Sequence, residues 1–197
     1  MKSILISLCL LAASSVQAKE LTGRQIIEKS KSLAKPKTGV TEVDMTIVKG
    51  GAKQLKVFTL KGVDTDKETG KTLIEFSKPN KIKLLTYSFK SKEDEQWLKM
   101  SSGRVKSIAS TSRGNYFVGS HFTFEDMRSK PIDNYDYKRL KDVKIENGVE
   151  CYQVESVMKK GKKVYSKTIN YIRKSDFLPM GSDLYVKGKM LKSVRNY

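Results

Sequence analysis

Period-two alternation of apolar and polar residues constrains the fold of this chain more than any other feature. The run Val43–Ile47 is one example, and similar runs recur to the end of the chain. Successive side chains of a β-strand point to opposite faces of its sheet, so each run predicts a half-buried strand. Turn residues such as Gly50-Gly51 and Asn147-Gly148 separate the runs at hairpin spacing, which predicts a meander of antiparallel strands.

The pattern predicts about ten strands in a single domain over residues 19–197, with no internal repeat or linker. The four prolines all fall between periodic segments, where a missing N–H group does no harm. The expected strands cover residues 43–47, 55–60, 72–76, 82–89, 96–100, 104–109, 138–145, 149–158, 163–173, 180–186 and 190–197.

Two helical segments interrupt this series of strands. Thr22 can cap the first helix, Gln25 completes a capping box with it, and Leu21 and Ile26 are spaced for a hydrophobic staple. Pro36 is expected to end that helix. The second segment, residues 119–128, is expected to be a turn followed by a short helix.

The first 18 residues have the composition of a secretory leader. Lys2 gives a positive start, Ile4–Ala13 is an apolar run, and Val16-Gln17-Ala18 is a small-residue cleavage site. The apolar run is too short to span a bilayer. The sequence therefore predicts a signal peptide over residues 1–18, cleavage after Ala18, and export of the remaining 179 residues.

Cysteine usage predicts no disulfide. Cleavage of the leader removes Cys9 and leaves Cys151 as the single cysteine, which cannot form an internal bridge. Cys151 lies in the alternating run Val149–Val154, so a buried and inert thiol is expected rather than a reactive one.

The chain is strongly basic, with 39 Lys and Arg residues against 21 Asp and Glu and a formal net charge of +18. Such a surface suits nucleic acid, polyanionic envelope polymers or an anionic membrane. The leader argues against nucleic acid, and so does the type of base, because only seven of the basic residues are Arg. Arg supplies the planar bidentate contacts that read phosphate and guanine. We therefore expect no nucleic-acid partner.

A lysine-rich surface fits an anionic membrane, since each Lys close to such a bilayer gains roughly 1 kcal/mol. The other interpretation is that the charge serves solubility alone, because the lysines are scattered along nearly every segment.

Catalytic chemistry has little support in the sequence. His121 is the only histidine, and Gly119-Ser120-His121 lacks the Gly-x-Ser-x-Gly elbow of a serine hydrolase. Zinc ligation would need carboxylates from distant parts of the chain, and no Gly-rich phosphate loop is present. Glu125-Asp126 is expected to charge the first turn of the short helix. The sequence predicts no enzyme, no catalytic residue, no metal site and no cofactor.

Three segments carry a resemblance to a known family, namely Trp97-Leu98, Arg104–Ile108 and Gly119–Met127. Family members show a Trp-Leu strand, a basic-apolar strand, and then a Gly-Ser-Asp-Phe-x-Tyr-Glu-Asp-like turn into a short helix. The chain thus resembles the LolA-like outer-membrane lipoprotein-sorting proteins of the Gram-negative periplasm.

The resemblance runs from about Glu42 to Tyr197, with two departures in the turn. His121 replaces the usual Asp, and Phe124 replaces the usual Tyr. Family members usually continue for a few more strands, so either a C-terminally shortened form or an incomplete chain is expected.

The family resemblance implies a mainly β (α+β) fold, an antiparallel incomplete β-barrel with an N-terminal helix and a short helix covering the open side. It implies a periplasmic carrier that binds lipid or lipoprotein acyl chains in a hydrophobic cavity and moves them between envelope membranes. An inner-membrane transporter fits as the donor. The residues expected to line the cavity are Val43, Met45, Ile47, Val57, Phe58, Ile74, Phe76, Leu85, Tyr87, Phe89 and Trp97 on strands, and Phe122, Phe124 and Met127 on the covering helix.

Other interpretations remain open at this point. By pattern alone, the same apolar residues would make an ordinary filled core, whereas a half-closed sheet covered by helices leaves room for a ligand. The main alternative function is a periplasmic interaction or sensor module of the same fold, which binds an envelope protein partner without transporting cargo. A lipid or polysaccharide hydrolase is disfavoured by the missing catalytic residues.

Overall fold

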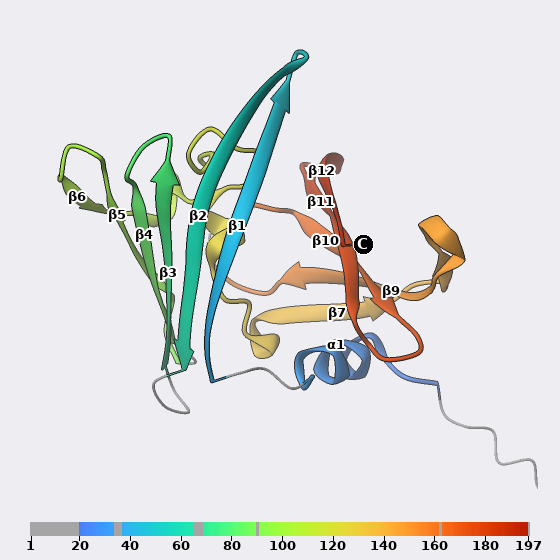
Figure 1. Ribbon diagram of the computed structural model, residues 1–197. Helices are drawn as coiled ribbons and strands as arrows, with labels where there is room; N and C mark the ends of the chain where they lie inside the picture. The colour runs from blue at the N-terminus through green and yellow to red at the C-terminus, as the bar shows by residue number, and fades with distance from the viewer. Residues whose placement is uncertain (1–19, 34–36, 65–68, 90, 162, 197) are drawn as a thin grey trace, which may run out of the picture.

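The computed structural model describes residues 20–33, 37–64, 69–89, 91–161 and 163–196, and Figure 1 shows their arrangement. The expected signal peptide and Cys9 lie outside the described residues. Within them, strands dominate and form two antiparallel sheets that do not close into a barrel (Figure 1). The expected mainly β (α+β) fold, with a helix near the N-terminus, is confirmed.

The first sheet is a six-stranded meander with the order β1-β2-β3-β4-β5-β6. Each strand pairs with its neighbours in the sequence, as short hairpin connections favour. The strands are β1 (Thr38–Lys49), β2 (Ala52–Asp64), β3 (Thr69–Lys78), β4 (Lys83–Phe89), β5 (Glu95–Lys99) and β6 (Val105–Ser107).

The second sheet has the order β12-β11-β10-β9-β7, and β8 also pairs with β9. It stands beside the first sheet on the right of Figure 1. Its strands are β7 (Tyr135–Arg139), β8 (Val143–Lys144), β9 (Glu150–Met158), β10 (Lys167–Arg173), β11 (Pro179–Val186) and β12 (Lys189–Arg195).

One α-helix, α1 (Gly23–Lys31), lies against the second sheet (Figure 1). The expected capping box forms, with Gln25 N donating to Thr22 Oγ1 at 3.3 Å and Thr22 N donating to Gln25 Oε1 at 2.9 Å. Ile26 and Ile27 are buried by this packing. Four short 3-10 helices are also present in the described residues, η1 (Ser110–Ser112), η2 (Phe124–Met127), η3 (Ile132–Asn134) and η4 (Glu146–Gly148).

Two of the predicted hairpins form with the expected turn chemistry. Gly50 and Gly51 connect β1 to β2 with φ values of 54° and 82°, a left-handed conformation that glycine adopts without strain. Asn147 and Gly148 have φ values of 62° and 74° between β8 and β9.

Most strands begin or end a few residues away from the predicted bounds, and two of these differences occur beside specific side-chain contacts. The expected strand over residues 138–145 divides into β7 and β8. Asp142 lies in the break, and both of its oxygens accept hydrogen bonds from Arg139 at 3.1 and 3.0 Å. The strand expected from residue 163 begins only at Lys167. Tyr165 lies before it and is directed away to the 3-10 helix η2, where its hydroxyl donates to Asp126.

The buried apolar residues form separate clusters for the two sheets. The cluster on the first sheet contains Ile74, Phe76, Leu84 and Leu98 together with Phe117 and Phe124, which come from the segment that follows β6. The clusters on the second sheet consist of residues of that sheet, its connections, α1 and the segments flanking them. Among the described residues, each sheet therefore has its own apolar clusters, and neither sheet contributes a strand residue to the clusters of the other.

Candidate functional site

The apolar residues predicted to line a cavity divide between the two faces of the first sheet. Residues directly opposite each other in an antiparallel ladder share a face. Phe58 lies opposite both Val43 and Phe76, whereas Leu85 lies opposite Trp97. On one face, which we call the covered face, lie Val43, Met45, Ile47, Phe58, Ile74 and Phe76; on the outer face lie Val57, Leu85, Tyr87, Phe89 and Trp97.

A cluster of aromatic rings lies on the covered face. The Phe76 ring lies 4.9 Å from the Phe58 ring and 5.6 Å from the Phe117 ring, measured between centroids. Phe117 also lies 5.5 Å from Phe124, with its ring tilted edge to face. Met45 and Met127 are half-buried against the same cluster.

Residues 108–130, which we call the covering segment, lie over this face. The expected short helix is the 3-10 helix η2, and it places Phe124 and Met127 against the sheet. Phe122 precedes η2 and is 38% exposed, because its backbone is held in a turn by Ser120 Oγ and Phe117 N. The structure therefore brings two of the three predicted covering residues into the cluster.

Sequence reasoning missed three central members of this cluster. Phe117 is 1% exposed, and it was not predicted because residues around it have no strand or helix period. Leu84 and Leu98 are the neighbours of predicted Leu85 and Trp97. In the pairs Leu84-Leu85 and Trp97-Leu98 both residues are apolar, so alternation alone does not say which one faces inward.

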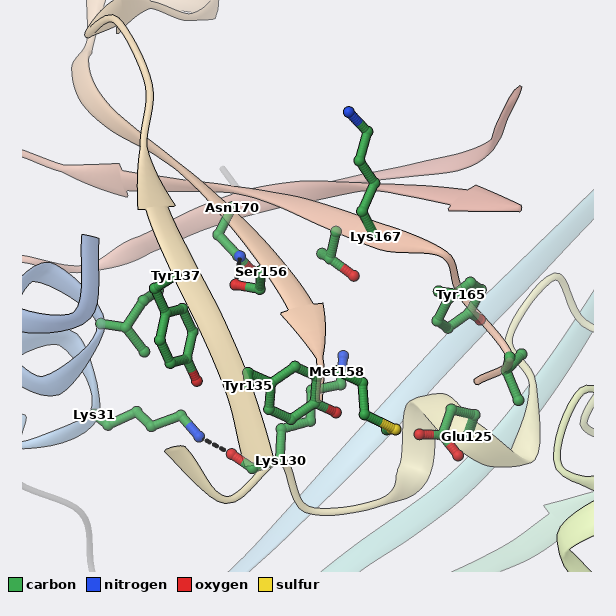
Figure 2. Close-up of a pocket in the computed structure, with 13 residues that line it drawn as sticks. Lys31, Glu125, Lys130, Tyr135, Tyr137, Ser156, Met158, Tyr165, Lys167 and Asn170 are labelled. Carbon is green, nitrogen blue, oxygen red and sulfur yellow. Dashed lines mark hydrogen bonds between the residues drawn. The ribbon is translucent and has the colours of Figure 1, made fainter. Parts of the chain in front are cut away.

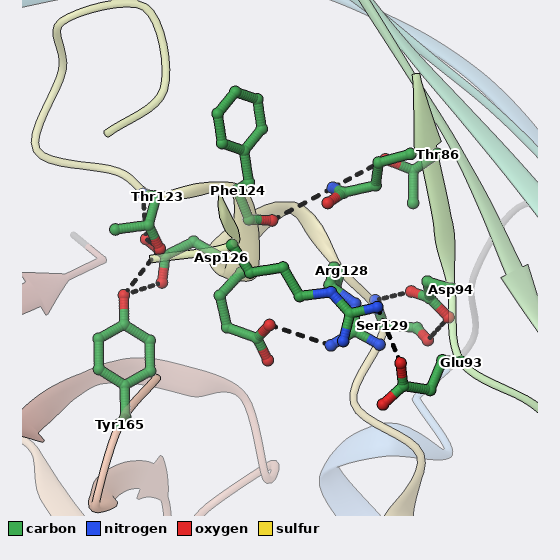
Figure 3. Close-up of polar contacts among 12 residues, drawn as sticks. Thr86, Glu93, Asp94, Thr123, Phe124, Asp126, Arg128, Ser129 and Tyr165 are labelled. Carbon is green, nitrogen blue, oxygen red and sulfur yellow. Dashed lines mark hydrogen bonds and ion pairs between the residues drawn. The ribbon is translucent and has the colours of Figure 1, made fainter. Parts of the chain in front are cut away.

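Polar contacts attach the covering segment to the first sheet (Figure 3). Ser129 donates to buried Asp94 through its N at 2.6 Å and its Oγ at 2.8 Å. Gln96 Nε2 donates to the Phe124 carbonyl at 3.2 Å. These bonds lie on β5 and the loop before it, so the segment is held by directional bonds as well as by apolar contact.

A buried ion pair stabilises the covering segment internally. Arg128 Nη1 lies 3.0 Å from Glu125 Oε2, and the two side chains are only 9% and 5% exposed. Each charge is therefore desolvated and depends on the other for compensation. Arg113, also buried, contacts Glu93 at 2.9 Å.

Asp126 connects the covering segment to the second sheet. It accepts hydrogen bonds from Thr123 N at 2.6 Å and from the Tyr165 hydroxyl at 2.8 Å, and it pairs with Lys192 of β12. Burial alone would raise the pKa of Asp126, but these three donors hold it below its ordinary value of 3.8. The carboxylate is thus charged at neutral pH. It links the covering segment of the first sheet to Lys192 of the second sheet.

A pocket of about 90 Å³ lies between α1, η2 and the second sheet, and we call it the inner pocket (Figure 2). Glu125 faces it from η2 and Lys31 approaches it from α1, with Tyr135 and Tyr137 of β7 between them. Its other lining residues are Ile27, Lys130, Ser156, Met158, Val164, Tyr165, Lys167, Thr168 and Asn170.

The tyrosines of the inner pocket are weak acids. Burial raises the pKa of Tyr135 and of Tyr137 to about 12, and it raises that of Tyr165 as well. All three hydroxyls remain protonated at neutral pH. Tyr165 already donates to Asp126, whereas Tyr135 and Tyr137 can donate hydrogen bonds to the polar part of a ligand. The inner pocket thus combines apolar walls with polar groups.

A second, open groove lies on the outer face of the first sheet and measures about 590 Å³. We call it the outer groove; it is lined by Thr69, Lys71, Leu85, Tyr87, Phe89, Glu95 and Trp97. The rings of Tyr87 and Trp97 meet edge to face at 5.6 Å. Four of the predicted cavity residues therefore share this groove, away from the covering segment.

Metal and membrane-spanning features are not found in the part of the chain that the structure describes. No three His, Cys, Asp or Glu residues lie close enough there to hold a metal ion. No helix there has the length and hydropathy needed to cross a bilayer. Cys151 is fully buried, and burial raises the pKa of its thiol.

Comparison with known proteins shows which family the chain resembles. A family model described as an uncharacterized protein, "-like", matches residues 68–197. No curated protein matches the chain.

Solved structures with a similar fold include the following three. A DUF1329 family protein from Desulfovibrio piger is 25% identical with a TM-score of 0.81, covering 87% of this chain and 75% of that one. A putative outer membrane lipoprotein-sorting protein domain from Vibrio parahaemolyticus is 25% identical with a TM-score of 0.80 and the same coverage. A LolA superfamily protein from Nitrosomonas europaea is 17% identical with a TM-score of 0.63, covering 89% and 77%, which shows the fold alone. The chain therefore belongs to a LolA-like family.

Proposed function

We propose that this protein is a periplasmic carrier that binds lipid or lipoprotein acyl chains and moves them between envelope membranes. The leader-like residues 1–18 support export, and residues 19–197 would then form the single mature domain. The observation that carries the proposal is that a short covering segment, and not the second sheet, closes the apolar covered face. Displacing that segment would expose an apolar surface without separating paired strands.

The physical need for such a carrier follows from the hydrophobic effect. Burial of one methylene is worth about 0.8 kcal/mol, so exposing an acyl chain of about fifteen methylenes to water costs roughly 12 kcal/mol. Crossing an aqueous gap therefore requires an apolar surface of similar extent on the carrier. Because the hydrophobic term has no direction, such a surface needs few polar contacts with its cargo.

In this proposal the covering segment moves when cargo binds. Ligand sites commonly measure about 300–1,000 Å³, and the inner pocket of about 90 Å³ is well below this range. An acyl chain would have to replace Phe117 and Phe124 on Ile74 and Phe76 of the covered face. The exchange substitutes one apolar contact for another, which keeps its net cost low and allows release.

Binding of a fluorescent fatty acid to the purified protein tests the proposal. We expect saturable binding that an unlabelled fatty acid displaces, and mass spectra of the purified protein that contain lipid. A folded circular dichroism spectrum together with clean mass spectra and no probe binding would contradict it.

The small size of the inner pocket favours a second candidate, an interaction module that binds an envelope protein without carrying cargo. Crosslinking in cells separates the two functions. A carrier should yield adducts with lipid or lipoprotein, whereas a module should yield one protein partner and no lipid.

A further inference from the structure

The strand register places a row of side chains that are apolar except for Lys61 across the outer face of the first sheet. Val40 lies opposite Lys61, Lys61 opposite Leu73, Leu73 opposite Leu85, and Leu85 opposite Trp97. In the rows beside it, Val63, Tyr87 and Phe89 face the same side. We call this set the outer band; it consists of Val40, Val63, Leu73, Leu85, Tyr87, Phe89 and Trp97.

The outer band is bordered by a row of charged and polar residues. Glu42, Thr59, Glu75, Lys83 and Lys99 follow one another across the sheet in that row. The band therefore has one sharp polar border, and none of its residues belongs to a core cluster in the described part of the chain.

Lysine ammonium groups lie over the aromatic rings of the band. Lys71 Nζ is 5.2 Å from the Tyr87 ring centroid, and Lys92 Nζ is 4.0 Å from that of Phe89. Such side chains keep their charge in water while their stems cover apolar surface. A face of Trp, Tyr and Phe with Lys among them has the composition of a membrane–water interface.

The charges around the band are predominantly positive. Glu75 pairs with Lys61 at 3.2 Å and with Lys83, and Glu95 pairs with Lys92 at 2.6 Å. Exposed ion pairs of this kind are weak and leave the lysines available to other anions. Lys71 and Lys99 add further positive charge.

We propose that the outer band docks the protein on the surface of an anionic bilayer. The aromatic side chains would enter the headgroup region, and the lysines would contact lipid phosphates. The net charge of +18 favours approach to such a surface. A second copy is a poorer occupant, because two-fold pairing of this face would set its lysines against each other. The inference concerns a face opposite the covering segment and does not depend on cargo binding.

The chain contains a single tryptophan, and Trp97 lies in the band, so its fluorescence reports on this face alone. With vesicles of mixed phosphatidylglycerol and phosphatidylcholine, the emission should shift to the blue and brominated lipids should quench it. Vesicles of phosphatidylcholine alone should produce neither effect. Co-sedimentation with anionic vesicles while Trp97 emission stays unchanged would overturn the proposal, because another face would then carry the binding.

Matched charge reversals distinguish binding through this face from binding that depends only on the net charge of the protein. Lys71→Glu should weaken vesicle binding at least about fivefold, the effect of one close lysine. Lys106→Glu changes the same charge on the opposite face, where Lys106 pairs with Leu98, and should change binding less than about twofold because salt screens it. Equal losses in the two variants would refute a dedicated face.

An apolar pair of variants completes the test. Phe89→Ser should reduce both binding and the blue shift, whereas Leu191→Ser, at an exposed position on β12 of the second sheet, should not. Circular dichroism and thermal melting establish that each variant is folded before binding is compared. Loss of binding in Leu191→Ser but not in Phe89→Ser would reject the band as the docking site.

Discussion

Tyr165 donates a hydrogen bond of 2.8 Å from its hydroxyl to Asp126, and this contact joins the residues just before β10 to the covering segment. Lys192 of β12 binds the same carboxylate. A residue that precedes β10 and a residue of β12 thus meet at one side chain of the segment that closes the first sheet. We expect this carboxylate to control how firmly the covering segment is held.

The stability contributed by Asp126 should depend on pH in the acid range. Its folded-state pKa is lower than its ordinary value of 3.8, so its contribution is complete above about pH 4 and falls as the pH drops through the folded pKa. Asp126→Asn should therefore melt at a lower temperature than the parent at neutral pH, and the difference should shrink in acid. Thermal melts from about pH 2 to pH 7 check this, and a difference that grows in acid would contradict the assigned contacts.

Loosening the covering segment should also affect cargo exchange. If the segment must move, Asp126→Asn should load and release a fluorescent fatty acid faster than the parent protein. Stopped-flow mixing measures both rates. Asp136→Asn serves as a control, since Asp136 is exposed on β7 and its nearest ion pair, with Lys159, is long at 3.8 Å. Equal rates in all three proteins would argue against a gating role for the segment.

Phe117 should be the most costly single truncation in the cluster on the covered face. Phe117→Ala removes a fully buried ring and should cost about 3–5 kcal/mol of unfolding free energy. The adjacent Tyr116 is 57% exposed, and Tyr116→Ala should change the free energy by less than about 0.5 kcal/mol. Urea denaturation of both variants measures these free energies. Similar losses in the two variants would contradict the central position of Phe117 in the cluster.

The Arg128–Glu125 pair should respond asymmetrically to mutation. Glu125→Ala leaves a buried guanidinium without its partner and should cost about 3–5 kcal/mol. The double variant Glu125→Ala with Arg128→Met should recover part of that loss, because no buried charge remains. A double-mutant cycle by urea denaturation measures the coupling, and purely additive losses would show that the pair is effectively solvated.

Substitution by aspartate should affect the stability of the fold strongly at Phe124 and little at Phe122. Phe124→Asp places a charge in the cluster and should destabilise the fold strongly, whereas Phe122→Asp should leave the secondary structure intact because Phe122 is partly exposed. Circular dichroism and melting temperature distinguish the two. Should Phe122→Asp unfold the protein, Phe122 would be core after all.

The sequence predicted the strands well because hairpin turns and alternation are local signals. Gly50-Gly51 and the Thr22–Gln25 capping box could be read directly from neighbouring residues, and both form. Which face of a strand points inward was harder to predict. Trp97 and Leu85 are large and apolar, yet they face outward, while Leu98 and Leu84 beside them are buried. That choice depends on where the covering segment lies, which only tertiary structure reveals.

Irregular backbone explains most of what the sequence did not predict. Phe117 sits in a segment without periodicity, so its burial had no local signature. The role of Asp126 needed Tyr165 and Lys192, which are distant in the sequence. The sequence suggested only that Asp126 would charge the start of a short helix, and the 3-10 helix η2 does carry it there.

The separation of the buried clusters has an evolutionary consequence. Since the residues beneath the covering segment share no member with those between α1 and the second sheet, substitutions in one group should add independently to those in the other. Selection could then reshape the surface beneath the segment for a new hydrophobic guest while the helix-bearing half keeps the molecule folded.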